Sequence, residues 1–130
     1  MYEWLKDYQQ MKDNLDYLEY KLILSERELA RWEDSDDLGD IKLEAGSKAS
    51  NLENIIASLK EEIEYKTIIL NNTIEVVSKF TGLNNQILRM KYIEGMTLYD
   101  IALQLNYSVG YIQQRHGEVM RTLKVIDEIE

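Results

Sequence analysis

The side chains of this sequence that are best suited to chemistry lie close together: Tyr111, Gln113, Gln114 and Arg115. Each ends in a group that forms hydrogen bonds. A glutamine amide can pair bidentately with adenine, and an arginine guanidinium can pair with guanine or contact a phosphate. These pairings make double-stranded DNA the first partner to consider. The alternative is a set of ordinary exposed polar residues on a packing helix.

Residues for covalent or metal chemistry are scarce. The chain contains a single histidine, His116, and no cysteine, which excludes a disulfide framework and a cysteine metal site. Its carboxylates are dispersed, and it has no glycine-rich phosphate loop. We therefore expect no enzymatic activity, no catalytic or metal-binding residue and no cofactor. We expect His116 to be a packed, hydrogen-bonded residue.

The sequence before and around the four side chains predicts two short helices. Thr97 is a suitable N-cap, and Asp100 three residues later completes a start like a capping box. Asn106 tolerates the left-handed conformation of a tight turn, and Ser108 can cap the next helix. Two amphipathic helices joined by so short a turn form a helix-turn-helix, a unit that reads DNA.

Helical spacing of about 100° per residue separates the two sides of the second helix. The residues expected to face inward are Ile112, His116, Val119 and Leu123. Those expected to face outward are Gly110, Gln114, Gly117 and Arg121, flanked by Tyr111, Gln113 and Glu118, with Arg115 at an edge. A third short helix is expected upstream from Ile87, Leu88, Met90 and Ile93, ending at Gly95.

This trihelical module resembles the C-terminal helix-turn-helix of bacterial sigma factors, known as region four. The resemblance lies in Glu94-Gly-Met-Thr, Ile101-Ala, Leu105-Asn-Tyr-Ser, Ile112 and Leu123. Residues 105–118 are still more similar to small regulators of this type carried by phages and prophages of Gram-positive bacteria. The resemblance covers about residues 84–125 and implies that the N-terminal half of the second helix reads the groove. It also implies contact with RNA polymerase.

Two further residues are placed to touch the DNA backbone. Thr97 and Tyr99, at the start of the first helix of the motif, could contact phosphates through their hydroxyls and the helix amides, although capping alone accounts for Thr97. The expected function is a DNA-binding transcription regulator of phage or prophage type. The expected DNA contacts are Thr97, Tyr99, Ser108, Tyr111, Gln113, Gln114 and Arg115.

The N-terminal part of the chain predicts a first long helix. Apolar residues at alternating spacings of four and three run from Trp4 to Trp32, as in the seam of a coiled coil, with Ser25 the one weak position. The chain has no proline and only six glycines, which favours long helices. A continuous helix of about 30 residues is expected here, about 45 Å long.

A second long helical pattern begins near Ser50 and runs to Phe80, with Lys66 and Thr73 interrupting its apolar seam. The acidic stretch over residues 33–40 suits a turn. Two long helices joined by one connection should fold back on each other as an antiparallel hairpin. The expected fold is therefore all-α, with a coiled-coil-like hairpin over residues 1–81 and the helix-turn-helix module over residues 82–130.

Apolar residues outside the two seams predict a second contact surface on the hairpin. We expect a homo-oligomer assembled through residues 1–80, because apolar stripes on long helices are usually buried against partners. The alternative is a monomeric bundle within one chain. The residues concerned are Ile23, Ile55, Ile68, Ile69, Ile74 and Val76.

The charge of the chain is unevenly distributed. The net charge is −9; residues 86–130 carry five basic and six acidic residues, and the first 85 carry ten basic and eighteen acidic. Because neutralisation of phosphates supplies most non-specific affinity, a nearly neutral module should need dimerisation or a protein partner to hold DNA.

No apolar run approaches the length needed to span a bilayer, and no signal peptide opens the chain, so a cytoplasmic protein without membrane contact is expected. Two other functions stay open. One is a DNA-packaging protein resembling small terminase subunits, which also join a helix-turn-helix to helical oligomerisation segments. The other is a polymerase-binding or scaffold protein whose helix-turn-helix does not bind DNA.

Overall fold

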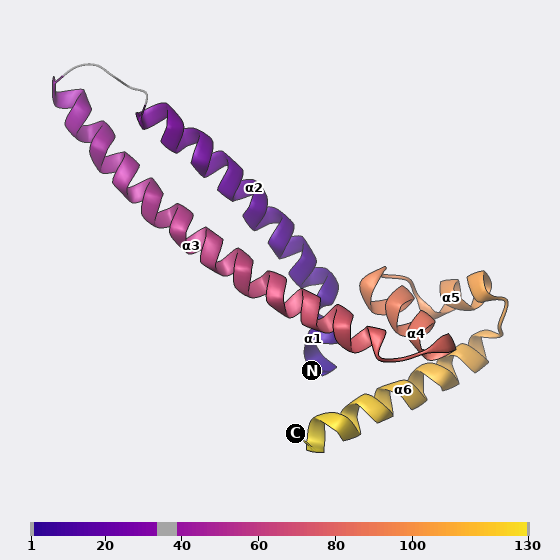
Figure 1. Cartoon of the computed structure of the whole chain (residues 1–130). Coiled ribbons are helices and arrows are strands. Elements are labelled where there is room, and N and C mark those ends of the chain that lie inside the picture. Colours follow the sequence, from indigo (N-terminus) through magenta and orange to yellow (C-terminus); the bar gives the residue numbers. More distant parts are fainter. Residues whose placement is uncertain (1, 34–38, 130) are drawn as a thin grey trace. The chain divides into compact units, whose positions relative to one another are not determined.

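The structure is a computed structural model that describes residues 2–33 and 39–129, and the described residues form helices and no strand (Figure 1). The predicted all-α class is therefore confirmed. In chain order the elements are α1 (Tyr2–Lys6), α2 (Tyr8–Glu33), α3 (Gly39–Ser78), α4 (Gly82–Leu88), the π-helical turn η1 (Arg89–Ile93), α5 (Leu98–Leu105) and α6 (Val109–Ile129).

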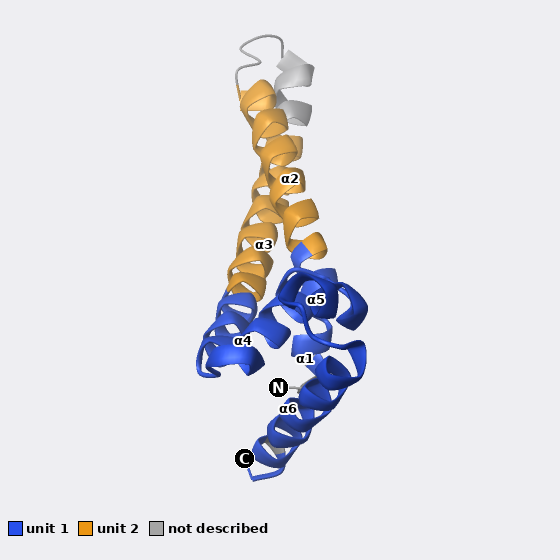
Figure 2. Cartoon of the chain, turned by 90° about the vertical axis from the view of Figure 1, so that its right-hand side faces the viewer, with its two compact units in different colours: residues 1–12, 68–130 blue, residues 13–67 orange. Residues whose placement is uncertain are grey.

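The chain divides into two compact units (Figure 2). Unit 1 combines residues 1–12 with residues 68–130, and unit 2 consists of residues 13–67. The boundary expected from the sequence lies between residues 81 and 82, where the long hairpin helices give way to the short helices of the motif. The two compact units are divided differently, because residues 1–12 and 68–81 pack with the C-terminal helices.

Unit 2 is a hairpin in which α2 and α3 lie side by side and run in opposite directions (Figures 1 and 2). One stripe on each helix is buried, as the seam pattern predicts, and Ser25 lies within it. The buried residues are Leu15, Ser25, Ile56 and Leu59, accompanied by half-buried Leu18, Leu22, Leu29, Trp32, Leu52 and Ile63. The predicted antiparallel hairpin is confirmed.

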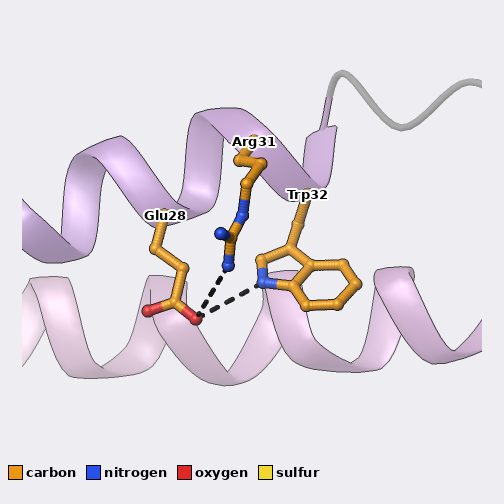
Figure 3. Close-up of polar contacts among 3 residues, drawn as sticks. All are labelled: Glu28, Arg31 and Trp32. Atoms are coloured by element: carbon orange, nitrogen blue, oxygen red, sulfur yellow. Dashed lines mark hydrogen bonds and ion pairs between the residues drawn. The ribbon is translucent and has the colours of Figure 1, made fainter.

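Polar contacts around Trp32 join the two helices of the hairpin near the end of α2. The ammonium of Lys48 lies 4.7 Å from the centre of the Trp32 ring. On α2 itself, the indole Nε1 of Trp32 donates to Glu28 at 3.5 Å, and Glu28 pairs with Arg31 at 3.7 Å (Figure 3). Exposed pairs of this kind contribute at most about 1 kcal/mol each, so the apolar seam dominates the stability of the hairpin.

The two long helices depart from their predicted limits in two places. The helix expected from near Ser50 begins at Gly39. The added turns include the strong helix formers Lys42, Leu43, Glu44, Ala45, Lys48 and Ala49. The helix expected to run unbroken from Trp4 is interrupted at Asp7, although the amide of Asp7 still bonds to the carbonyl of Glu3 at 2.9 Å. Most of the predicted turn over residues 33–40 lies outside the described residues.

The two polar residues that interrupt the seam of α3 have partners on the same helix. Thr73 is 2% exposed, and its hydroxyl donates to the carbonyl of Ile69 at 3.0 Å. Lys66 pairs with Glu62 at 3.2 Å. A buried hydroxyl that bonds to the backbone of its own helix adds no unsatisfied group to the core. The seam therefore tolerates Thr73 as a small, satisfied residue.

Unit 1 is built around two apolar clusters. In the first, the start of the chain and the end of α3 pack on the second half of α6; in the second, the three helices of the motif pack on each other. The first cluster contains Leu5, Val77, Leu88, Tyr92, Val119, Met120 and Leu123. The second contains Ile87, Met90, Ile101, Ala102 and Ile112. Both clusters pack against α6. The second cluster contacts its first turns through Ile112, and the first cluster contacts its later turns through Val119, Met120 and Leu123.

None of the helices in the described ranges combines the length and the apolar character that crossing a membrane requires.

Candidate nucleic-acid interface

The first helix of the motif, α5, begins as its sequence predicts. Thr97 has an extended backbone, and its Oγ1 accepts a hydrogen bond from the amide of Asp100 at 3.1 Å. This bond satisfies an amide that the helix itself cannot pair, and the Asp100 carboxylate lies in the first turn, where the helix dipole favours negative charge. The predicted N-cap at Thr97 is therefore confirmed.

The turn between α5 and α6 rests on two polar residues. Asn106 adopts the left-handed conformation, with φ of 63° and ψ of 39°, and ends α5. The amide of Tyr107 then bonds to the carbonyl of Ala102 at 3.0 Å. The Oγ of Ser108, the residue after Tyr107, accepts from the amide of Tyr111 at 3.1 Å and caps α6. Both turn predictions are confirmed, and they fix where α6 starts.

The third helix of the motif is present, but its second half is a π-helical turn that the sequence did not predict. The amide of Glu94 bonds five residues back to the carbonyl of Arg89 at 2.9 Å, and Gly95 follows with a φ of 78°. The side-chain amide of Gln9 on α2 donates to the carbonyls of Tyr92, at 3.3 Å, and of Ile93. Gln9 therefore caps the end of this helix from a distant part of the sequence.

His116 is packed and hydrogen-bonded, as expected. Its Nε2 lies 2.7 Å from the hydroxyl of Tyr92, and the two rings stack with centres 5.8 Å apart. The same hydroxyl lies 3.6 Å from the sulfur of Met120. Burial, followed by the nearby charges of Lys91 and Lys6, lowers the pKa of His116. The neutral imidazole is thus favoured, and it holds the middle of α6 against η1.

The two sides of α6 are as the helical spacing predicts, except that Gly117, expected to face outward, is half-buried. Ile112, Val119 and Leu123 are at most 2% exposed, whereas Gln113 and Gln114 are exposed. Next to the glutamines, the Tyr111 ring lies 5.2 Å from that of Tyr107, centre to centre. At Gly110, even an added Cβ would meet no atom within 4 Å. The start of α6 therefore presents amides and aromatic rings above an uncrowded backbone.

Arg115 differs from its neighbours because it is half-buried and engaged within the protein. Its Nη2 donates to Oδ1 of Asn84 on α4 at 2.8 Å, and its Nη1 donates to the hydroxyl of Tyr111 at 3.3 Å. Its Nε is enclosed and has no hydrogen-bond partner in the described part of the chain. The sequence placed Arg115 at an edge of the helix but offered no signal for Asn84.

The remaining predicted contacts are accessible in unit 1. Thr97, Tyr99 and Ser108 are exposed, and Tyr99 retains 59% of its accessible surface. The hydroxyls of Thr97 and Ser108 accept cap bonds, which leaves their protons free to be donated. The structure thus gathers six exposed candidates along α5, the turn and α6, with Arg115 beneath them.

Positive charge lies beside this group of residues rather than within it. Arg121 and Lys124 are exposed further along α6, and Arg89 is exposed on η1. Such side chains are suited to contact phosphates, because lysine and arginine neutralise the phosphate charge regardless of base sequence. Within the described ranges, no group of three or more histidine, cysteine, aspartate or glutamate side chains could hold a metal ion.

No family model matches the chain, and comparisons with curated proteins and with solved structures gave no match.

Proposed function

We propose that this chain is a cytoplasmic, DNA-binding transcription regulator of the phage and prophage type, in which the helix starting after Ser108 enters the major groove. One observation carries the proposal. The exposed amides of Gln113 and Gln114 lie on a helix whose start is capped by Ser108. The opposite side of this helix is buried, since Ile112 and Val119 are at most 2% exposed. Base reading needs side chains held in a fixed register by a rigid element, and α6 supplies one.

The proposed regulator works as a homo-oligomer through residues 1–80. The nearly neutral motif favours this, since a second copy doubles the number of phosphate contacts made at once. Apolar side chains outside the seam also remain accessible on both long helices, as Ile23 at 49%, Ile68 at 52% and Ile74 at 42% illustrate. Burying them against another copy would remove apolar surface from water.

Contact with RNA polymerase belongs to the proposal through the resemblance to sigma region four. The low positive charge of the motif favours a second candidate, a polymerase-binding or scaffold protein that does not bind DNA. A terminase-like packaging protein is a third, supported by the same combination of helix-turn-helix and helical hairpin. Ring-shaped assemblies would distinguish the third from the first.

Selection from a random duplex library at low salt, using the full chain, tests the proposal. We expect one sequence motif to be enriched. If none is enriched while the chain still captures RNA polymerase, the polymerase-binding function replaces DNA reading.

Gln114→Ala sharpens the test. It should weaken binding to the enriched site by about 1 to 3 kcal/mol and leave binding to unrelated DNA almost unchanged, because a base contact is lost. Gln10→Ala is the matched control: Gln10 is an exposed glutamine on α2, outside the motif. An equal loss for both variants would argue against base reading by Gln114.

A further inference from the structure

We infer that the start of α6 reads A·T base pairs, and that Arg115 is a positioning residue rather than a guanine contact. The inference rests on the proposed function, because it concerns the base pairs that this helix would meet.

Guanine is commonly read by an arginine that points two N–H groups at O6 and N7. Arg115 is the arginine nearest to the exposed glutamines, but its guanidinium is engaged. Nη2 donates to Asn84 and Nη1 to Tyr111, while Nε is enclosed by protein. A pair of donors that includes Nε cannot reach solvent, and turning Nη1 and Nη2 toward a base would give up both hydrogen bonds.

The acceptor of Arg115 is itself held in place. Asn84 lies on α4, and its neighbour Asn85 donates from its side-chain amide to the carbonyl of Val77 at 2.9 Å, which ties α4 to the end of α3. Arg115 therefore fastens the recognition helix to a fixed point and supports Tyr111 through the same guanidinium. Its planar guanidinium holds the two partners in a fixed geometry, which the single flexible ammonium of a lysine would not impose.

The groups left to read bases favour adenine and thymine. Gln113 and Gln114 are exposed, and no hydrogen bond within the described residues engages their amides. A glutamine amide matches N6 and N7 of adenine. The exposed rings of Tyr111 and Tyr107 offer apolar surface to the thymine methyl group. The open backbone at Gly110 lets this end of the helix approach the base edges closely.

The other exposed arginine of α6 lies too far along the helix to take over guanine reading at the same base pairs. Arg121 follows Gln114 by seven residues, which is about 10 Å of helix rise. Side chains at that distance suit the phosphates on the rim of the groove. The residues proposed to meet the bases thus include no arginine free to pair bidentately with guanine.

The motif enriched from a random duplex library by the full chain tests the inference directly. We expect A·T pairs at every position whose preference is lost in Gln114→Ala, with affinity for the motif falling by about 5- to 150-fold. Arg115→Ala and Asn84→Ala should each lower affinity for the motif more than for unrelated duplex, yet retain the same preferred base pairs. Circular dichroism checks that each variant remains helical.

Arg121→Ala is the matched control, since it removes an arginine of the same helix that has no role in this positioning. It should weaken binding to all sequences alike and lower the salt dependence by about one unit.

The results that would overturn the inference differ from those that overturn the proposed function. A motif that requires G·C at the position relaxed by Arg115→Ala, or at the position relaxed by Gln114→Ala, would overturn the inference and leave DNA reading intact. If Arg115→Ala does not fold, Asn84→Ala decides in its place, because it removes the acceptor that holds the guanidinium. Unchanged preferred base pairs would support Arg115 as a positioning residue, and a guanine preference that is gained or lost in this variant would overturn the inference. A library with no enriched sequence would overturn both proposals.

Discussion

Unit 1 and unit 2 are both helical, but they bury their apolar residues in different ways. In unit 1, Ile87, Leu88, Ile101 and Ile112 are fully buried in clusters that draw on several helices. In unit 2, the buried residues form a single seam that includes Ser25, and its best-buried member, Leu15, keeps 6% of its surface. A core enclosed from several sides fixes side chains in position, whereas a two-helix seam leaves the outer faces open to partners. This difference is compatible with the proposed roles of the two units, DNA reading by unit 1 and assembly by unit 2.

The largest expected effect is on the free energy of unfolding, and it should differ between the two kinds of core. Leu123→Ala in unit 1 should lower the free energy of unfolding by about 2 to 5 kcal/mol, because the enclosed site cannot collapse around the lost atoms. Leu22→Ala in unit 2 makes the same chemical change at a half-buried position and should cost clearly less. Denaturant unfolding of both variants measures the comparison. Equal losses would show that the seam is as tightly enclosed as the clusters.

Assembly is the next effect. The chain should be a dimer or higher oligomer at micromolar concentration, and Ile23→Glu should weaken association by about 10- to 100-fold, since a charge would be desolvated at the interface. Val125→Glu places the same charge at an exposed position of α6, outside residues 1–80, and should leave association unchanged. Sedimentation velocity measures both. A wild-type monomer at about 100 µM would rule out the proposed assembly.

A pair of glycines should respond to alanine with opposite signs. Gly95 has a φ of 78°, so Gly95→Ala should destabilise the protein by about 1 to 2 kcal/mol. Gly46 lies inside α3, with open space around its Cα, so Gly46→Ala should stabilise by about 0.5 to 1 kcal/mol through helix propensity. Thermal unfolding tests both substitutions. Destabilisation by Gly46→Ala would mean that this part of α3 is not helical in solution.

The smallest effect is a pH dependence confined to unit 1. The pKa of His116 is lowered in the folded state, so the unfolded chain binds the proton more readily. The stability that this histidine contributes should be complete above its ordinary pKa of about 6.5 and decline as pH falls through the lower folded value. Wild-type protein should therefore lose stability relative to His116→Phe on acidification. A stability difference that is constant from pH 8 to pH 5 would contradict this.

What the sequence predicted well depends on contacts between residues close in the chain. The caps at Thr97 and Ser108 and the turn at Asn106 each involve groups within three or four residues, and helical spacing identified the buried side of α6. The seam of the hairpin followed from the same periodicity. Local rules of this kind need no knowledge of what lies across the fold.

What the sequence could not predict involves partners that are distant along the chain. Asn84 lies 31 positions from Arg115, and Gln9 lies more than 80 positions from the carbonyls that it caps. Neither residue interrupts an apolar pattern or matches a capping motif, so neither is distinguished before folding. The π-helical turn was missed for the same reason, since its free carbonyls are satisfied by Gln9. The sequence therefore predicted Arg115 as an available DNA contact, whereas in the structure its guanidinium donates to Asn84.

The cap formed by Gln9 has a consequence for how the protein matures. Leu5 and Gln9 precede their partners in η1 and α6 by more than 80 residues. Unit 1 is therefore interrupted in the sequence by the whole of unit 2, and it cannot close until both of its parts have been synthesised. The hairpin can pair earlier, since both of its helices precede the motif. Each new chain would thus complete its hairpin before α6, so that under the proposed function the assembly surface forms before the recognition helix.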